Sequence, residues 1–278
     1  MHSSHSFAMI GMMYERRIIM NRDLAIEVFK NYTDNYDSSE PKVALKIEHS
    51  FKVCEIAEQI AASLKLPDED IELAWFMGLL HDIGRFEQLR RFGTFYDAKS
   101  IDHAELSADI LFVDGFIKNF DVTGLPEDWA ALTELAIRAH NKLTIPEDLT
   151  EREALFANLL RDADKVDIFR VIAEIPYKDR ANFKNVPQRE EARKEIMQCV
   201  KEHRCVPRTF ERTKFETSLS HGCMAFELVF PKSKELALAQ GFLRKIIQNA
   251  SEDANEKELL QLAVLKEELE KHFHATVS

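Results

Sequence analysis

Residues 74–85 read Ala74-Trp75-Phe76-Met77-Gly78-Leu79-Leu80-His81-Asp82-Ile83-Gly84-Arg85. The run from Ala74 to Leu80 is apolar, and it ends at a histidine followed by an aspartate. A carboxylate that closes such a run is costly to bury unless it is paired or bound to a metal. The stretch therefore predicts a buried helix whose end presents His81 and Asp82 to an internal site.

Four more side chains of metal-binding type lie on or beside apolar helical faces. Aliphatic side chains follow His49 at steps of four and three residues. This spacing places His49 and those side chains on one helical face. His103 heads a similar face, His140 ends one, and Asp164 lies within one. Each residue alone is more simply explained as a hydrogen-bonded core residue, but the joint pattern favours a metal site. Imidazole and carboxylate donors together suit iron, manganese, zinc, nickel or cobalt rather than calcium.

These motifs resemble the signature of the HD superfamily. Residues 79–85 are similar to its most recognisable motif, and residues 162–167 resemble its closing motif, in which the second aspartate binds metal. The segments 100–105 and 136–142 look like the carriers of the two added histidines of its dinuclear branch. The resemblance covers residues 41–170 and leaves the rest of the chain unassigned. It implies a ligand set of His49, His81, Asp82, His103, His140 and Asp164.

The resemblance implies a metal-dependent phosphohydrolase that cleaves a phosphomonoester or a phosphodiester. Asp82 would bridge two ions, with His49, His81 and Asp164 completing one ion and the two remaining histidines holding the other. Iron or manganese is expected first, and zinc, nickel and cobalt remain open. The nucleophile would be a metal-bound hydroxide.

Basic and polar neighbours of the motifs are candidates for contacts with the substrate. Arg85 follows the His-Asp pair by three residues, and we predict that it is a catalytic phosphate contact. Lys165, Asn141 and Lys142 are further predicted substrate contacts, although each lysine is equally well read as a surface charge. Asp102 precedes His103 and is predicted to orient it, as carboxylates often do for ligating histidines.

Two other functions remain open at this point. Some members of the superfamily use a di-iron pair with the same ligand order to activate dioxygen, so ligand order does not separate an oxygenase from a hydrolase. A catalytically inactive nucleotide-sensing module is the other alternative. The segment 86–99 carries Phe95 and Tyr96, which could stack on a base or pack against the protein, and we favour packing.

Patterning along the chain predicts an all-α protein, an HD-domain helical bundle with additional C-terminal helices. Helices are expected at residues 23–32, 41–64, 67–82, 103–116, 127–140, 150–175, 188–202, 233–249 and 255–273. Residues 84–102 are expected to form a loop, and residues 224–230 could be strand or helix. The predicted divisions are an N-terminal extension with disorder as one reading (1–20), the HD domain (21–185) and a helical cap packed on it (186–278).

Composition limits the partners of the protein. The 278 residues carry a net charge of −11, which disfavours extended binding to nucleic acid or to anionic membranes. A small phosphorylated substrate, with nucleotides among the options, remains compatible, and a homodimer is left open. No apolar run is as long as a membrane span, and the basic pair near the N-terminus follows its apolar patch, unlike in a secretory signal. We therefore expect a cytoplasmic protein.

Overall fold

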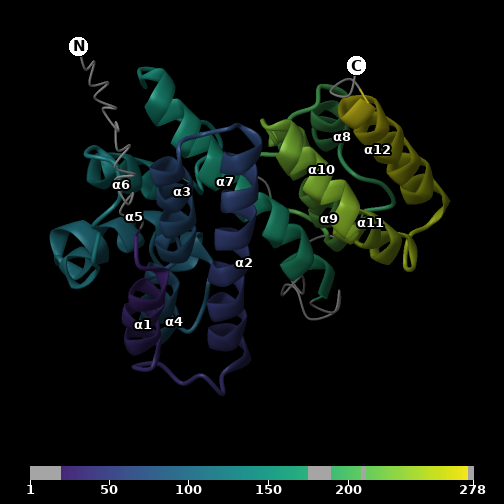
Figure 1. Cartoon of the computed structure of the whole chain (residues 1–278). Coiled ribbons are helices and arrows are strands. Elements are labelled where there is room, and N and C mark those ends of the chain that lie inside the picture. The colour runs from purple at the N-terminus through teal and green to yellow at the C-terminus, as the bar shows by residue number, and fades with distance from the viewer. Residues whose placement is uncertain (1–19, 175–188, 208–210, 275–278) are drawn as a thin grey trace, which may run out of the picture.

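The computed structural model describes residues 20–174, 189–207 and 211–274 (Figure 1). These residues form helices, short turns and loops, and no strand occurs within these ranges. The predicted all-α class, a helical bundle followed by additional helices, is confirmed. The predicted N-terminal extension lies outside the described residues except for Met20, which is buried. The predicted domain boundaries stay a prediction.

The first half of the chain contains the helices that carry the sequence motifs. Pro41 occupies the first turn of the second helix, where its missing N–H costs nothing. The third helix opens with three acidic residues, which suit the positive end of the helix dipole. The helices are α1 (Arg22–Thr33), α2 (Pro41–Ser63), α3 (Asp68–Leu80), α4 (Gly84–Phe92), α5 (His103–Ala108), α6 (Trp129–Ala139) and α7 (Glu151–Glu174).

The second half differs from the prediction in three places. The helix expected over 188–202 begins only at Lys194. Gly241, at φ 73°, ends one helix and starts the next, so the single helix expected over 233–249 is wrong. A further helix, α9, begins at a capping box formed by Thr213 and Glu216, and it was not predicted. The ambiguous stretch 224–230 contains a 3-10 turn. The helices are α8 (Lys194–Lys201), α9 (Lys214–Cys223), α10 (Pro231–Gln240), α11 (Phe242–Ser251) and α12 (Glu256–His274).

The prediction of a loop over residues 84–102 is wrong for its first part, which is helix α4. This helix is short and rich in arginine, but Phe86 is fully buried and Leu89 packs against the core. Gly93, at φ 66°, then stops the helix in the left-handed conformation that favours glycine. Later in the segment that was expected to be a loop, Asp97–Lys99 form a 3-10 turn.

Two glycines allow the motif-bearing helices to approach one another closely. A Cβ atom on Gly78 would lie 2.8 Å from the backbone nitrogen of Cys54, so α3 packs directly on the backbone of α2. A Cβ atom on Gly84 would lie 2.6 Å from the backbone nitrogen of Ser107, so α4 packs in the same way on α5. The first contact brings together the helices of two histidine motifs, and the second sets α4 against the helix that begins at His103.

Helix α7 lies between the earlier helices and the later ones in Figure 1. It packs against α2 and α6 on one side and against α10 and α11 on the other. Asp162 of α7 accepts hydrogen bonds from the backbone nitrogens of Val229 and Phe230, at 2.9 and 3.0 Å, immediately before α10 begins. Among the described residues, no helix combines the length and the apolar character that a membrane crossing requires.

Candidate metal centre

The first half of the centre gathers residues from three helices. His49 lies on α2, His81 directly follows α3, and Asp164 lies on α7. The Nε2 atoms of His49 and His81 are 3.2 Å apart. Oδ1 of Asp164 is 3.1 Å from Nε2 of His49 and 3.6 Å from Nε2 of His81. These donors come from segments that are distant in sequence, and they meet in a buried space.

The second half of the centre is built on α5 and α6. His103 is the first residue of α5, and His140 directly follows α6. Their Nε2 atoms lie 3.1 Å apart. Both face Oδ1 of Asp82, at 3.5 Å from His103 and 3.8 Å from His140.

Asp82 belongs to both halves because its two oxygens face different histidines. Oδ2 lies 3.5 Å from Nε2 of His49 and 3.5 Å from Nε2 of His81. Oδ1 faces the other pair and has no hydrogen-bond partner among the described residues, although it is buried. An anionic oxygen in that position is well suited to bind a cation, since a buried unpaired charge is costly.

All four imidazoles are oriented from their far side. Nδ1 of His81 and Nδ1 of His140 lie 2.8 and 2.7 Å from backbone carbonyl oxygens, which can only accept a hydrogen bond. Nδ1 of His49 and Nδ1 of His103 each lie 2.7 Å from a carboxylate oxygen. With the proton on Nδ1, each ring directs the lone pair of Nε2 into the centre, as metal-ligating histidines do.

The charge states of both aspartates and of His140 also suit a metal centre. Burial alone would lower the pKa of His81, but the carboxylates of Asp82 and Asp164 raise that pKa to about 9. Burial alone would raise the pKa of Asp82, but neighbouring cationic side chains, Lys46 first, hold that pKa well below its usual range. Burial is likewise outweighed at Asp164, where the neighbouring imidazoles of His49 and His81 keep the pKa well below its usual range. Burial beside two other imidazoles lowers the pKa of His140 to about 3. Ionised carboxylates and a neutral imidazole are the forms that bind metal.

The four histidines and two aspartates predicted from the sequence therefore lie together. The donor set contains nitrogen and oxygen atoms only, and it fits divalent transition metals such as iron or manganese. Three groups of three residues among the described residues could hold an ion: two of them share Asp82, and the third consists of Asp97, Asp102 and His103.

Among the predicted substrate contacts, Arg85 lies against the centre. Its Nη2 atom is 3.2 Å from Nε2 of His103, and its Nε atom is 3.5 Å from Oδ1 of Asp82. Lys165 pairs instead with Glu227 at 3.2 Å. Only Arg85 of the predicted basic contacts therefore touches the predicted ligands in the described structure.

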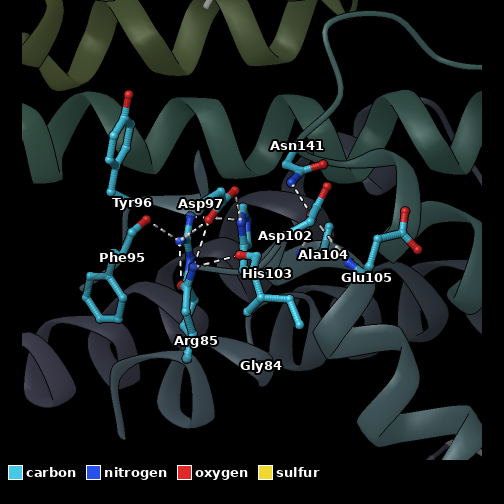
Figure 2. Close-up of polar contacts among 12 residues, drawn as sticks. Gly84, Arg85, Phe95, Tyr96, Asp97, Asp102, His103, Ala104, Glu105 and Asn141 are labelled. Carbon is cyan, nitrogen blue, oxygen red and sulfur yellow. Dashed lines mark hydrogen bonds and ion pairs between the residues drawn. The ribbon is translucent and has the colours of Figure 1, made fainter. Parts of the chain in front are cut away.

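Lys142 and Asn141 contact Asp102, which corrects the role predicted for that carboxylate. Asp102 accepts a hydrogen bond from Asn141 at 2.7 Å, and it caps α5 by accepting from the nitrogen of Ala104 (Figure 2). It also accepts a hydrogen bond from Lys142 at 2.6 Å. The prediction that Asp102 orients His103 is wrong, because its oxygens face the start of α5 and the loop after α6 rather than the imidazole.

Asp97, and not Asp102, orients His103. Oδ2 of Asp97 lies 2.7 Å from Nδ1 of His103, and Oδ1 accepts a hydrogen bond from Nη1 of Arg85 at 3.0 Å (Figure 2). The same Oδ1 accepts a hydrogen bond from Gln88 at 2.9 Å. One carboxylate thus fixes both a predicted ligand and the cation beside it. Asp97 lies six residues before His103 on the 3-10 turn, and no motif in the sequence marks it.

Sequence reasoning also missed two residues that contact predicted ligands. Lys46 lies 2.5 Å from Oδ2 of Asp82, and Asp167 lies 2.7 Å from Nδ1 of His49. A signal for both exists in helical spacing, because Lys46 lies three residues before His49 and Asp167 lies three residues after Asp164.

Packing within the chain was favoured for Phe95 and Tyr96, and the two rings differ. Tyr96 is 57% exposed, so its ring does not pack into the core of the chain. Phe95 is half-buried, and its ring lies beside the cationic groups of Arg85 and Lys46.

Comparison with known proteins identifies the domain that holds this centre. The family model of the HD domain matches residues 47–168, a range that includes all six predicted ligands. No curated protein and no solved structure gives a significant match to the chain. The HD superfamily is one of metal-dependent hydrolase-type proteins, and some of its members have other activities. Residues 47–168 of the chain are therefore an HD domain.

Proposed function

We propose that the protein is a metal-dependent phosphohydrolase that cleaves a small phosphate ester. The observation that carries this proposal is the position of Asp82, whose two carboxylate oxygens each face a separate pair of histidine Nε2 atoms. Two cations bound on either side of one carboxylate are a recurring arrangement in enzymes that transfer or hydrolyse phosphoryl groups. The superfamily assignment agrees with this class of reaction.

The proposed division of the ligands follows the two halves of the centre. His49, His81 and Asp164 would complete one cation, and His103 and His140 would hold the other, with Asp82 shared. Iron or manganese is proposed first, with zinc, nickel or cobalt as further candidates. When bound, such cations acidify water and neutralise charge on a phosphoryl group.

The protein's own side chains would position the reacting groups. Asp97 holds the imidazole of His103 and the guanidinium of Arg85 in fixed orientations. Arg85 would then direct its positive charge toward a phosphoryl oxygen at the second half of the centre, where a planar fork of donors suits phosphate. The carboxylates on the far side of His49 and His103 keep both rings in the tautomer that binds a cation.

The substrate is proposed to be a small phosphorylated molecule, and a nucleotide is one such compound. The net charge of −11 disfavours a long polyanion, because an acidic surface repels it. A compact phosphate ester meets only the local cations of the centre. This distinction separates a phosphatase or small-molecule phosphodiesterase from a nuclease acting on long nucleic acid.

Turnover of chromogenic esters tests the proposal. The manganese-loaded protein, assayed without oxygen, is expected to release nitrophenol from p-nitrophenyl phosphate or from bis(p-nitrophenyl) phosphate. Asp82→Ala should abolish the release, whereas Asp148→Asn, at an exposed position away from the centre, should leave it unchanged. Oxygen consumption by the protein loaded with reduced iron, without ester turnover, would overturn the proposal in favour of an oxygenase. Nucleotide binding without turnover under any metal would overturn it in favour of a sensing module.

A further inference from the structure

Lys46 is a buried cation inside the candidate metal centre. It lies on α2, one turn before His49, and only 6% of its surface is exposed. Its Nζ atom is 2.5 Å from Oδ2 of Asp82. Among the residues that the structure describes, Asp82 is the one carboxylate with which Lys46 forms an ion pair. A buried ammonium group requires an anionic partner, because the isolated charge is costly to bury.

The two oxygens of Asp82 each face a different cationic side chain. Oδ2, which faces the first half of the centre, contacts Lys46. Oδ1, which faces the second half, lies 3.5 Å from Nε of Arg85. Each half of the centre therefore has one cation at its edge, and the two cations come from different helices, α2 and α4.

The ring of Phe95 lies beside both cations. Its centroid is 5.9 Å from Nζ of Lys46 and 5.5 Å from Cζ of Arg85. The carbonyl oxygen of Phe95 accepts a hydrogen bond from Arg85 at 2.8 Å (Figure 2). An aromatic face attracts a cation without cancelling its charge. Phe95 thus helps to hold both cations near Asp82 while leaving their charges available to an anion.

We propose that Lys46 and Arg85 form a two-cation clamp for a terminal phosphoryl group, so that the preferred substrates are phosphomonoesters. This inference rests on the proposed function. Once Asp82 shares its charge with bound cations, Lys46 needs another anion close by, and a phosphoryl oxygen supplies it. A terminal phosphoryl group carries close to two negative charges near neutral pH. A diester carries a single charge, so one cation at each half of the centre suits the monoester better.

Binding of inorganic phosphate and dimethyl phosphate to the manganese-loaded protein, measured by calorimetry, tests the clamp. The wild type should bind phosphate more tightly than dimethyl phosphate. Lys46→Met should weaken phosphate binding roughly 10- to 100-fold, the usual loss for a hydrogen bond to a charged group, and should reduce the preference over dimethyl phosphate. Its metal content should equal that of the wild type. Lys52→Met, at an exposed position of the same helix, is the matched control and should change neither quantity.

A purely structural role for Lys46 predicts a different result. In that case Lys46→Met would change the melting temperature of the metal-free protein and leave the dissociation constant for phosphate unchanged, which would overturn the clamp. If Lys46→Met does not fold, Lys46→Gln, which can still donate a hydrogen bond to Asp82, should show the same loss of phosphate binding. Lys46→Arg keeps the charge and should retain most of the binding.

The clamp and the proposed function fail in distinguishable ways. Turnover of both ester classes with an unchanged phosphate affinity in the Lys46 variants would contradict the clamp alone. Absence of ester turnover and of phosphate binding in the wild type would contradict the proposed function and the clamp together.

Discussion

The Nδ1 atom of His49 lies 2.7 Å from Oδ2 of Asp167, although 118 residues separate the two in sequence. Arg170 holds Asp167 in turn, with Nε 2.8 Å from Oδ1 and Nη2 2.9 Å from Oδ2. This chain of contacts runs from α7 to α2 and fixes the ring of His49 with Nε2 directed at the centre. The far-side contact is therefore part of the candidate metal centre even though Asp167 is not a predicted ligand.

Replacing Asp167 should weaken metal binding without removing a ligand. Asp167→Asn is expected to lower metal affinity about 10- to 100-fold, because such orienting partners fix the tautomer and direction of the imidazole. Competition with a chromogenic chelator measures the change. Asp148→Asn is the control at an exposed position, and an affinity for metal equal to the wild type in the Asp167 variant would contradict the role assigned to this contact.

Asp97 and Asp102 offer a matched pair at the second half of the centre. Asp97→Ala should weaken metal binding there, because His103 loses its orienting carboxylate. Asp102→Ala should leave metal affinity unchanged and lower the free energy of unfolding by about 1 kcal/mol, the usual cost of losing a helix cap. Metal titration and denaturant unfolding of both variants check this. If Asp102→Ala weakened metal binding and Asp97→Ala lowered only the free energy of unfolding, the role predicted for Asp102 from the sequence would be restored.

Gly84 is predicted to be required for the close packing of α4 on α5. In an ordinary helix interior, glycine to alanine stabilises by roughly 1 kcal/mol. At this position the new Cβ would lie 2.6 Å from the backbone nitrogen of Ser107, so Gly84→Ala should destabilise by about 1–3 kcal/mol. Denaturant unfolding gives the sign directly, and a more stable variant would show that the two helices can separate without loss.

Asp162 should anchor the segment before α10 to α7. One of its oxygens accepts two backbone hydrogen bonds, from Val229 and Phe230. Asp162→Ala leaves both donors, of which the nitrogen of Phe230 is buried, without their partner, and a loss of about 1–3 kcal/mol in the free energy of unfolding is expected. Circular dichroism during thermal unfolding would measure it. Unchanged stability would mean that the C-terminal helices are held to α7 by other contacts alone.

The convergence of the predicted ligands could be anticipated from the sequence because each lies on an apolar helix or directly after one. Helical spacing fixes which side of α2 or α7 is buried, so it also fixes the direction of His49 and Asp164. The same reasoning failed for Asp102 and Asp97, which lie at the end of a connecting segment. Asp102 is adjacent to His103 in sequence, but adjacency does not fix the direction in which its side chain points. The Asp102 carboxylate faces the backbone nitrogens that it caps.

The boundaries of the helices were harder to predict where one residue decides them. Gly241 separates α10 from α11 because the backbone there adopts a left-handed conformation, which the apolar pattern on either side does not reveal. Helix α4 was mistaken for a loop because its arginines and short length hid a single buried face around Phe86. Lys46 was missed since a lysine before a histidine motif is usually a surface charge.

The metal content of freshly purified protein tests the central claim most directly. Elemental analysis of the wild type should find about two equivalents of iron or manganese per chain, consistent with a carboxylate that two cations share. His103→Ala removes a ligand from the second half only, so the content should fall to about one equivalent. A wild type that holds a single equivalent, unchanged in His103→Ala, would contradict the shared centre at Asp82.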